Sequence, residues 1–138
     1  MDDDRLRDIY AETSTIAVVG ASKDESKPSH SIPAYLQNQG FKIIPVSPRG
    51  GEIFGEKVYP TLAEVTEPVD VVDVFRPADE APGIAREAVE IGAKVLWLQS
   101  GISSDEAYQI ATAAGMQVVM DACMGVTHGR LGLGPGPH

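Results

Sequence analysis

The stretch Thr15–Ser22, which reads TIAVVGAS, decides the fold that this sequence predicts. Its apolar run is too short for a helix but fits a strand that is buried on both faces, and such a strand is usually central in a sheet. Gly20 lets the backbone turn sharply at the end of the run, and the polar loop from Lys23 to His30 leads towards a helix. The free N–H groups at the start of a helix attract anions, so we expect a ligand at this turn.

Length and charge restrict the class of protein. The 138 residues suit one domain over residues 1–138. Eleven Lys and Arg residues against twenty Asp and Glu residues give a net charge of -9, so neither nucleic acid nor a membrane is an expected partner. Cys123 is the only cysteine, which excludes an intramolecular disulfide and a cysteine-built zinc site, and no metal site is expected. No signal peptide or long apolar run occurs, so a cytoplasmic location is expected.

Short apolar runs and helical patterns alternate along the rest of the chain. Further strands are expected at residues 41–46, 69–75, 94–98 and 117–120. Helices are expected at residues 5–10 and after caps at Ser29 or Ser31, at Asp79, and at Ser103 with Glu106. This alternation predicts an α/β fold of the Rossmann-like, doubly wound type, in which a mostly parallel sheet lies between two helical layers.

Three local features qualify this pattern. Pro45 removes a backbone donor, so its strand ends there or lies near an edge of the sheet. Residues 52–59 are interpreted as a connector with at most a short extended piece at 57–59, and Thr61 is expected to cap one helical turn. Residues 129–138 are rich in Gly and Pro and are predicted to form a flexible tail.

The carboxyl ends of the strands form the expected ligand edge, because open α/β sheets bind ligands there. Lys23, Lys27, Arg49 and Arg76 follow three of these strands and place four of the eleven cations on this edge. An acidic protein that gathers cations at one edge is expected to hold phosphates there.

The choice of phosphate ligand depends on two further positions. A dinucleotide fingerprint needs three glycines, and only Gly20 is present in that register, which disfavours NAD. An NAD site also places a carboxylate at the end of the second strand, whereas this chain has Ser47, Pro48 and Arg49. An arginine suits a phosphorylated ribose, which leaves NADP and coenzyme A (CoA) as candidates.

Four motifs carry a resemblance to a known family: residues 16–22, 45–51, 74–77 and 97–102. Together they resemble the small stand-alone CoA-binding proteins of bacteria and archaea, which are similar to the N-terminal CoA-binding domain of the succinyl-CoA synthetase α subunit. The resemblance covers about residues 5–130. It implies CoA or an acyl-CoA as the ligand.

The resemblance also implies roles for particular residues. Gly20, Ala21 and Ser22 match the turn that contacts CoA, and Arg49 matches the basic residue that meets the nucleotide. Leu98, Gln99 and Ser100 match the segment beside the pantetheine arm. Phe75, Arg76 and Pro77 match a loop over the ligand, although the synthetase has a small residue in place of Arg76. Position at the ligand edge adds Lys23, Lys27, His30, Ser47, Pro48 and Gly101 to the expected binding residues.

Catalysis is not expected from this chain. The synthetase's phosphorylated histidine lies in a second domain that this sequence lacks, and the sequence has no grasp-type nucleotide-binding domain for ATP. His30 is interpreted as a hydrogen-bonding residue rather than a base, and Cys123 as a buried small hydrophobe rather than a thiol that forms a mixed disulfide with CoA. We therefore expect a CoA-binding module with no catalytic residues. The alternatives are an NADP-dependent oxidoreductase or other small nucleotide-cofactor enzyme, and a regulatory protein that senses CoA and docks on an unknown partner.

Overall fold

A five-stranded parallel sheet forms the centre of the protein, whose computed structural model describes residues 1–136. The strand order is β2-β1-β5-β6-β7. The strands are β1 (Thr15–Val19), β2 (Lys42–Val46), β5 (Val71–Val74), β6 (Val95–Leu98) and β7 (Gln117–Val119). Each lies within one of the predicted apolar runs, and β1 has a neighbour on both sides, so the predicted Rossmann-like α/β fold is confirmed.

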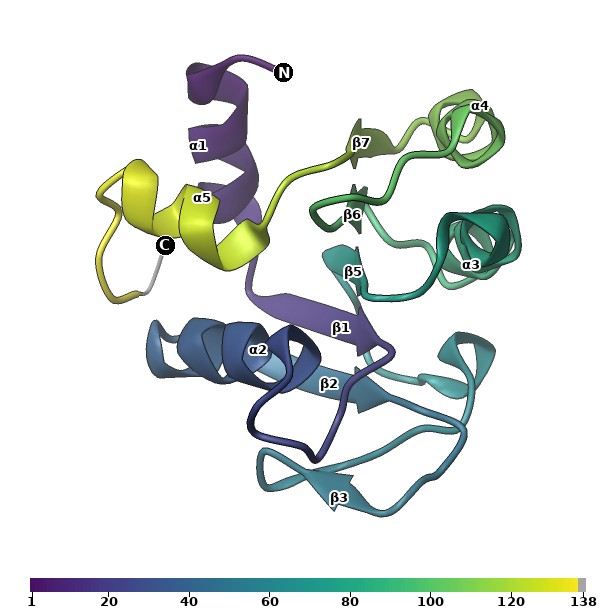
Figure 1. The fold of residues 1–138 in the computed structure, drawn as a ribbon. Coiled ribbons are helices and arrows are strands. Elements are labelled where there is room, and N and C mark those ends of the chain that lie inside the picture. Colours follow the sequence, from purple (N-terminus) through teal and green to yellow (C-terminus); the bar gives the residue numbers. More distant parts are fainter. Residues whose placement is uncertain (137–138) are drawn as a thin grey trace.

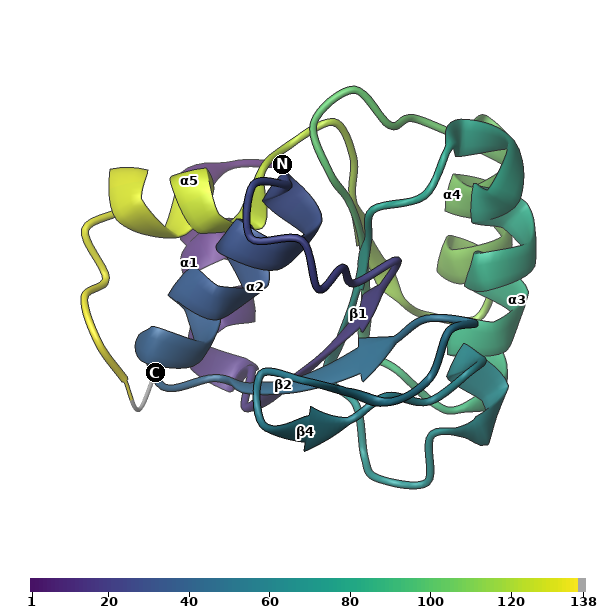
Figure 2. The same ribbon diagram turned by 60° about the horizontal axis from the view of Figure 1, so that its bottom comes forward.

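Helices cover both faces of this sheet. The helices α1 (Asp3–Glu12), α2 (Pro28–Asn38) and α5 (Met124–Arg130) lie on one face, and α3 (Ala81–Glu90) and α4 (Asp105–Ala113) lie on the other (Figures 1 and 2). Each helical layer buries a hydrophobic core against the sheet. Strand β1 contributes Ile16 and Val18 to the core beneath α1, α2 and α5, and Ala17 and Val19 to the core beneath α3 and α4, since successive side chains point to opposite faces. No helix within residues 1–136 is long and apolar enough to cross a membrane.

The connector after β2 is more ordered than its composition predicts. Strand β2 lies at the sheet edge, as Pro45 indicated, and Tyr59 extends that edge by donating its N–H to the Pro45 carbonyl oxygen over 3.1 Å. A small hairpin of β3 (Glu52–Ile53) and β4 (Glu56–Lys57) precedes it and was not predicted. Its turn residues, Phe54 and Gly55, both have positive φ (60° and 73°), which a tight hairpin turn requires but which a phenylalanine rarely adopts.

Three predicted helix caps are wrong by one or a few residues. Helix α2 begins at Pro28, because proline tolerates the first helical position, so Ser29 and Ser31 lie inside the first turn. Asp79 lies within a short 3₁₀ helix, η2 (Ala78–Glu80), that precedes α3, and therefore caps nothing. The cap of α4 is Ser104, whose Oγ accepts the Ala107 N–H over 3.1 Å. The predicted Thr61 cap is confirmed at η1 (Leu62–Glu64).

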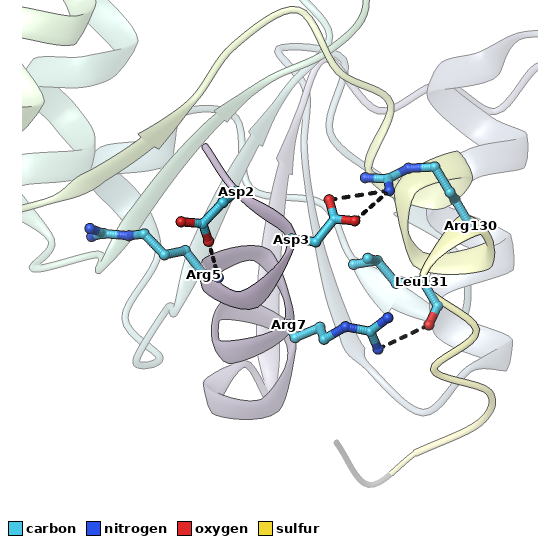
Figure 3. A network of polar contacts seen from close by, with 6 residues as sticks. All are labelled: Asp2, Asp3, Arg5, Arg7, Arg130 and Leu131. Carbon is cyan, nitrogen blue, oxygen red and sulfur yellow. Dashed lines mark hydrogen bonds and ion pairs between the residues drawn. The ribbon is translucent and has the colours of Figure 1, made fainter.

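The predicted flexible tail is wrong for its first residues. Gly129 and Arg130 end helix α5, and Leu131 is buried. Figure 3 shows how α5 is fixed to α1: the Arg130 guanidinium pairs with the Asp3 carboxylate at 3.1 Å, and the Arg7 Nη1 donates to the Leu131 carbonyl oxygen at 3.1 Å. These partners are more than a hundred residues apart, so local composition could not predict them. Residues 137 and 138 of the predicted tail lie outside the described residues.

Candidate functional site

The strand order locates the ligand edge more narrowly than the sequence did. From β1 the chain crosses through α2 to β2 on one side, and then returns to β5 on the other side of β1. Ligands of open α/β sheets bind outside the carboxyl ends of the strands at such a reversal. The turns after β1 and β5 are therefore the centre of the candidate site.

A cleft of about 1130 Å³ lies at this reversal, and we name it the first cleft. Its lining includes ten of the sixteen predicted binding residues: Gly20, Ala21, Ser22, Lys23, Lys27, Ser47, Pro48, Arg49, Phe75 and Arg76. These residues come from the loops that follow β1, β2 and β5. The fold thus brings together three loops that lie far apart in the sequence.

The turn after β1 needs a glycine for two reasons. Gly20 has φ +92°, and a Cβ placed on it would lie 2.9 Å from the Arg76 Cδ and 3.0 Å from the Phe75 carbonyl oxygen. Its N–H donates to the Val46 carbonyl oxygen at 2.9 Å, which joins the ends of β1 and β2. The turn is therefore closely packed against the end of β5.

His30 fixes the loop that follows this turn. Its Nδ1 donates to the Ser22 carbonyl oxygen over 2.7 Å, and its ring packs on Phe54 of the β3–β4 hairpin with 4.9 Å between centroids. Asp24 accepts hydrogen bonds from the hydroxyl and N–H of Ser26, which hold the pKa of its carboxyl below the usual value. His30 does not line the cleft, and its place agrees with the interpretation as a hydrogen-bonding residue.

The cations of the first cleft differ in their partners. Within residues 1–136, Lys23, Lys27 and Arg49 form no ion pair, whereas Arg76 pairs with Glu80. Lys23 extends towards the loop after β2, since a Cβ on Gly51 would lie 3.0 Å from its Nζ. The loops after β1 and β2 therefore present three cations that form no ion pair in the described residues, and Asp24, which lines the same cleft, offsets part of their charge. The remaining excess of positive charge suits an anionic ligand.

A second cleft, of about 540 Å³, adjoins the first. The two share the lining residues Lys27, Ser29 and Phe75. The other lining residues of the second cleft are Pro28, Ile32, Gln99, Ser100, Ile102 and Cys123. Its side chains are mostly apolar, and it has none of the arginines of the first cleft.

The burial of Cys123 differs from that predicted from the sequence. Its side chain is half-buried and lines the second cleft, and its Sγ accepts the Val126 N–H at 3.5 Å. The prediction of a buried hydrophobe is therefore wrong, because the chain turns out of β7 into α5 at this residue. No group of metal-ligating side chains is found among residues 1–136.

A buried polar network supports the wall of the second cleft. Gln99 donates its amide N–H to the fully buried Asp73 carboxyl, and its Oε1 accepts the Met124 N–H over 3.3 Å. The Met124 carbonyl oxygen accepts the Tyr10 hydroxyl at 2.6 Å. Burial raises the pKa of Asp73 to about 7, and the Gln99 hydrogen bond opposes this only in part. The network fixes the start of α5 against β5 and β6.

The remaining predicted residues lie outside both clefts in the described part of the chain. Leu98 is fully buried, Pro77 precedes η2, and the Gly101 N–H donates to the Asp121 carboxylate at 2.6 Å. Sequence reasoning missed several lining residues of the first cleft, namely Thr61, Leu62, Glu80, Ile84 and Glu87. They lie on η1, η2 and α3, whose approach to the cleft depends on packing. For Asp73 a signal existed, since it is an acid within an apolar run.

Comparisons with known proteins agree with this architecture. The family model of the CoA binding domain matches residues 14–129. The uncharacterized protein YneT of Bacillus subtilis is 39% identical over 123 residues, which are 89% of this chain and 91% of YneT. A solved structure from Thermus thermophilus, cell-free ID.343, has a TM-score of 0.91 and 43% identity, and the match covers 95% of this chain and 99% of that one.

A larger protein also contains a similar region. The ADP-forming acetate–CoA ligase II of Archaeoglobus fulgidus is 34% identical over 103 residues. These are 72% of this chain but only 15% of the ligase. The match therefore concerns one region of the ligase.

Proposed function

The chain belongs to the CoA binding domain family, and from that premise we propose that it binds CoA or an acyl-CoA across the two clefts, as one domain without catalysis of its own. The observation that carries the proposal is the junction of a cationic cleft with an apolar one. CoA has the same two parts, since a phosphorylated nucleotide is joined to a less polar thiol arm.

Each part of CoA has proposed partners. The turn at Gly20 and the start of α2 hold the pyrophosphate, because backbone N–H groups and nearby cations favour negative charge there. Arg49 holds the ribose phosphate, and a guanidinium can bind a phosphate through two hydrogen bonds. The pantetheine arm passes Phe75, which lines both clefts, and ends beside Gln99, Ser100 and Cys123.

Thermal unfolding with CoA, NADP and NAD tests this proposal against the oxidoreductase alternative. A ligand that binds only the folded state stabilises it by about 2.7 kcal/mol at a hundredfold excess over Kd. We expect CoA to raise the melting temperature and NAD to leave it unchanged. A shift with NADP and none with CoA would overturn the proposal.

The absence of catalysis has its own test. Acyl-CoA chemistry needs an activated nucleophile, a tuned base or a metal at the thioester. At the second cleft Cys123 has the Val126 N–H as a neighbour, and Gln99 is engaged with Asp73 and Met124. We expect no release of free thiol from acetyl-, succinyl- or long-chain acyl-CoA, with or without ATP and magnesium. Release that is lost in Cys123→Ala would point to a thioesterase or acyltransferase instead.

A further inference from the structure

Arg76 differs from the other cations of the first cleft, because its guanidinium already forms an ion pair with a carboxylate. It lies just beyond β5, and its Nη2 is 2.7 Å from the Glu80 Oε2 while its Nε is 3.2 Å from the Glu80 Oε1. Both side chains line the cleft. This is a two-point pairing of a guanidinium with a carboxylate, the geometry in which an arginine also binds a phosphate.

The stem of Arg76 lies over the turn at which a phosphate is expected. A Cβ on Gly20 would lie 2.9 Å from the Arg76 Cδ and 3.3 Å from its Cγ. The guanidinium at the end of this stem is joined to Glu80, the last residue of η2, just before α3. Arg76 therefore reaches past the Gly20 turn and is held on the α3 side of the cleft.

The pair is accessible enough to exchange partners. The side chains of Arg76 and Glu80 are 47% and 45% exposed. An exposed ion pair adds little to stability, so a better acceptor can displace one of its members. The mutual hydrogen bonds raise the pKa of Arg76 and lower that of Glu80, so both are charged and Glu80 competes as an anion.

We propose that Glu80 is an internal competitor that pairs with Arg76 in the free protein and tunes affinity, and that the pyrophosphate of the ligand displaces it. This inference rests on the proposed function and adds a residue to it. A ligand without a pyrophosphate at the Gly20 turn leaves the pair intact and gains nothing from Arg76. A ligand that has one must displace the Glu80 carboxylate from Arg76 before its phosphate can pair there, so Glu80 lowers the affinity for pyrophosphate-containing ligands and leaves that for other ligands unchanged.

A matched control exists between α3 and α4, outside both clefts. Arg86 of α3 pairs with Glu106 of α4 at 3.2 Å, with side chains 59% and 64% exposed. Neither residue lines either cleft. Glu106→Gln thus removes one carboxylate from a comparable exposed pair without touching the proposed site.

Calorimetric titration with CoA, dephospho-CoA and pantetheine tests the proposal. We expect Glu80→Gln to bind CoA and dephospho-CoA about two- to fivefold more tightly than the wild-type protein, because an exposed pair no longer has to be broken. Pantetheine, which lacks the pyrophosphate, should show no gain, and Glu106→Gln should match the wild type for all three ligands. In an Arg76→Gln background, Glu80→Gln should bring no gain, since the two residues act as one unit.

The other outcomes separate this proposal from the proposed function. If the wild type binds CoA and Glu80→Gln binds it equally or more weakly, the role of Glu80 is overturned and the proposed function stands. A gain for CoA but not for dephospho-CoA contradicts the pyrophosphate assignment. If neither protein binds CoA, the proposed function fails and the role of Glu80 falls with it. Thermal unfolding of each variant without ligand verifies that all are folded.

Discussion

The two clefts are built on opposite physical principles. The first cleft has its lysines and arginines on loops, and Lys23, Lys27 and Arg49 form no ion pair within residues 1–136. The second cleft is mostly apolar, and its one amide, Gln99, is held by the buried Asp73 and the backbone of Met124. Under the proposed function, exposed charges meet the anionic end of the ligand, while a buried network shapes the wall beside its other end.

The largest expected effect concerns Asp73, the buried carboxyl that holds Gln99 in the wall of the second cleft. Burial raises the pKa of Asp73 to about 7 from an ordinary value of 3.8, so the folded protein holds a proton that the unfolded chain releases. The contribution of Asp73 to the free energy of unfolding is fully present below pH 3.8, its ordinary pKa. It is lost as the pH rises through the pKa of about 7 in the folded protein. Between pH 5 and pH 8 the loss is about 3 kcal/mol. Denaturant unfolding of Asp73→Asn should lack this loss.

Asp70 provides the control for that measurement. It accepts the N–H groups of Ser14 and Thr15 at 2.8 and 3.0 Å. Burial raises its pKa, but these bonds and Lys94 outweigh burial and leave the pKa below its usual value. Asp70 is therefore ionised in both states above pH 5, and Asp70→Asn should keep the wild-type pH slope. A wild-type slope in Asp73→Asn would contradict the titration of Asp73.

The second-largest effect comes from removing the Arg49 side chain, which lines the first cleft but not the second. If Arg49 holds the ribose phosphate, Arg49→Ala weakens the binding of CoA by about 1.5–3 kcal/mol and scarcely changes the affinity for dephospho-CoA. Isothermal titration calorimetry with both ligands measures this difference. Equal losses for both ligands would mean that Arg49 contacts the pyrophosphate or has a structural role.

The smallest effect tests the apolar wall. Ile102 is half-buried and lines the second cleft. Ile102→Ala should weaken the binding of CoA by about 1 kcal/mol, because part of an apolar contact with the ligand is lost. This loss should be the same at low and high salt, whereas the loss from Arg49→Ala should shrink as salt screens the charge. Val126→Ala is the control, since Val126 is 65% exposed and lines neither cleft. A salt-dependent loss in Ile102→Ala would remove the distinction between the clefts.

Sequence reasoning performed well where the determinant is local. Apolar runs such as Ile16–Val19 placed all five strands, because a strand buried on both faces needs apolar side chains in succession. The cations of the first cleft were also predicted, since the loop after each parallel strand emerges at the same edge. Four motifs in order sufficed to predict the family. That the residues of either cleft bind CoA stays a prediction.

Tertiary structure decided what depends on distant partners. The sequence could state that Asp73 lies in a strand, but its burial, its bond to Gln99 and its raised pKa depend on how α5 packs over β5 and β6. Helix α5 itself depends on contacts of Arg130 and Leu131 with α1, at the other end of the chain. In the same way, Glu80 enters the first cleft only because η2 follows β5 there. Local propensity sets the elements, whereas solvent exclusion between elements sets the charge state and the reach of the side chains at their junctions.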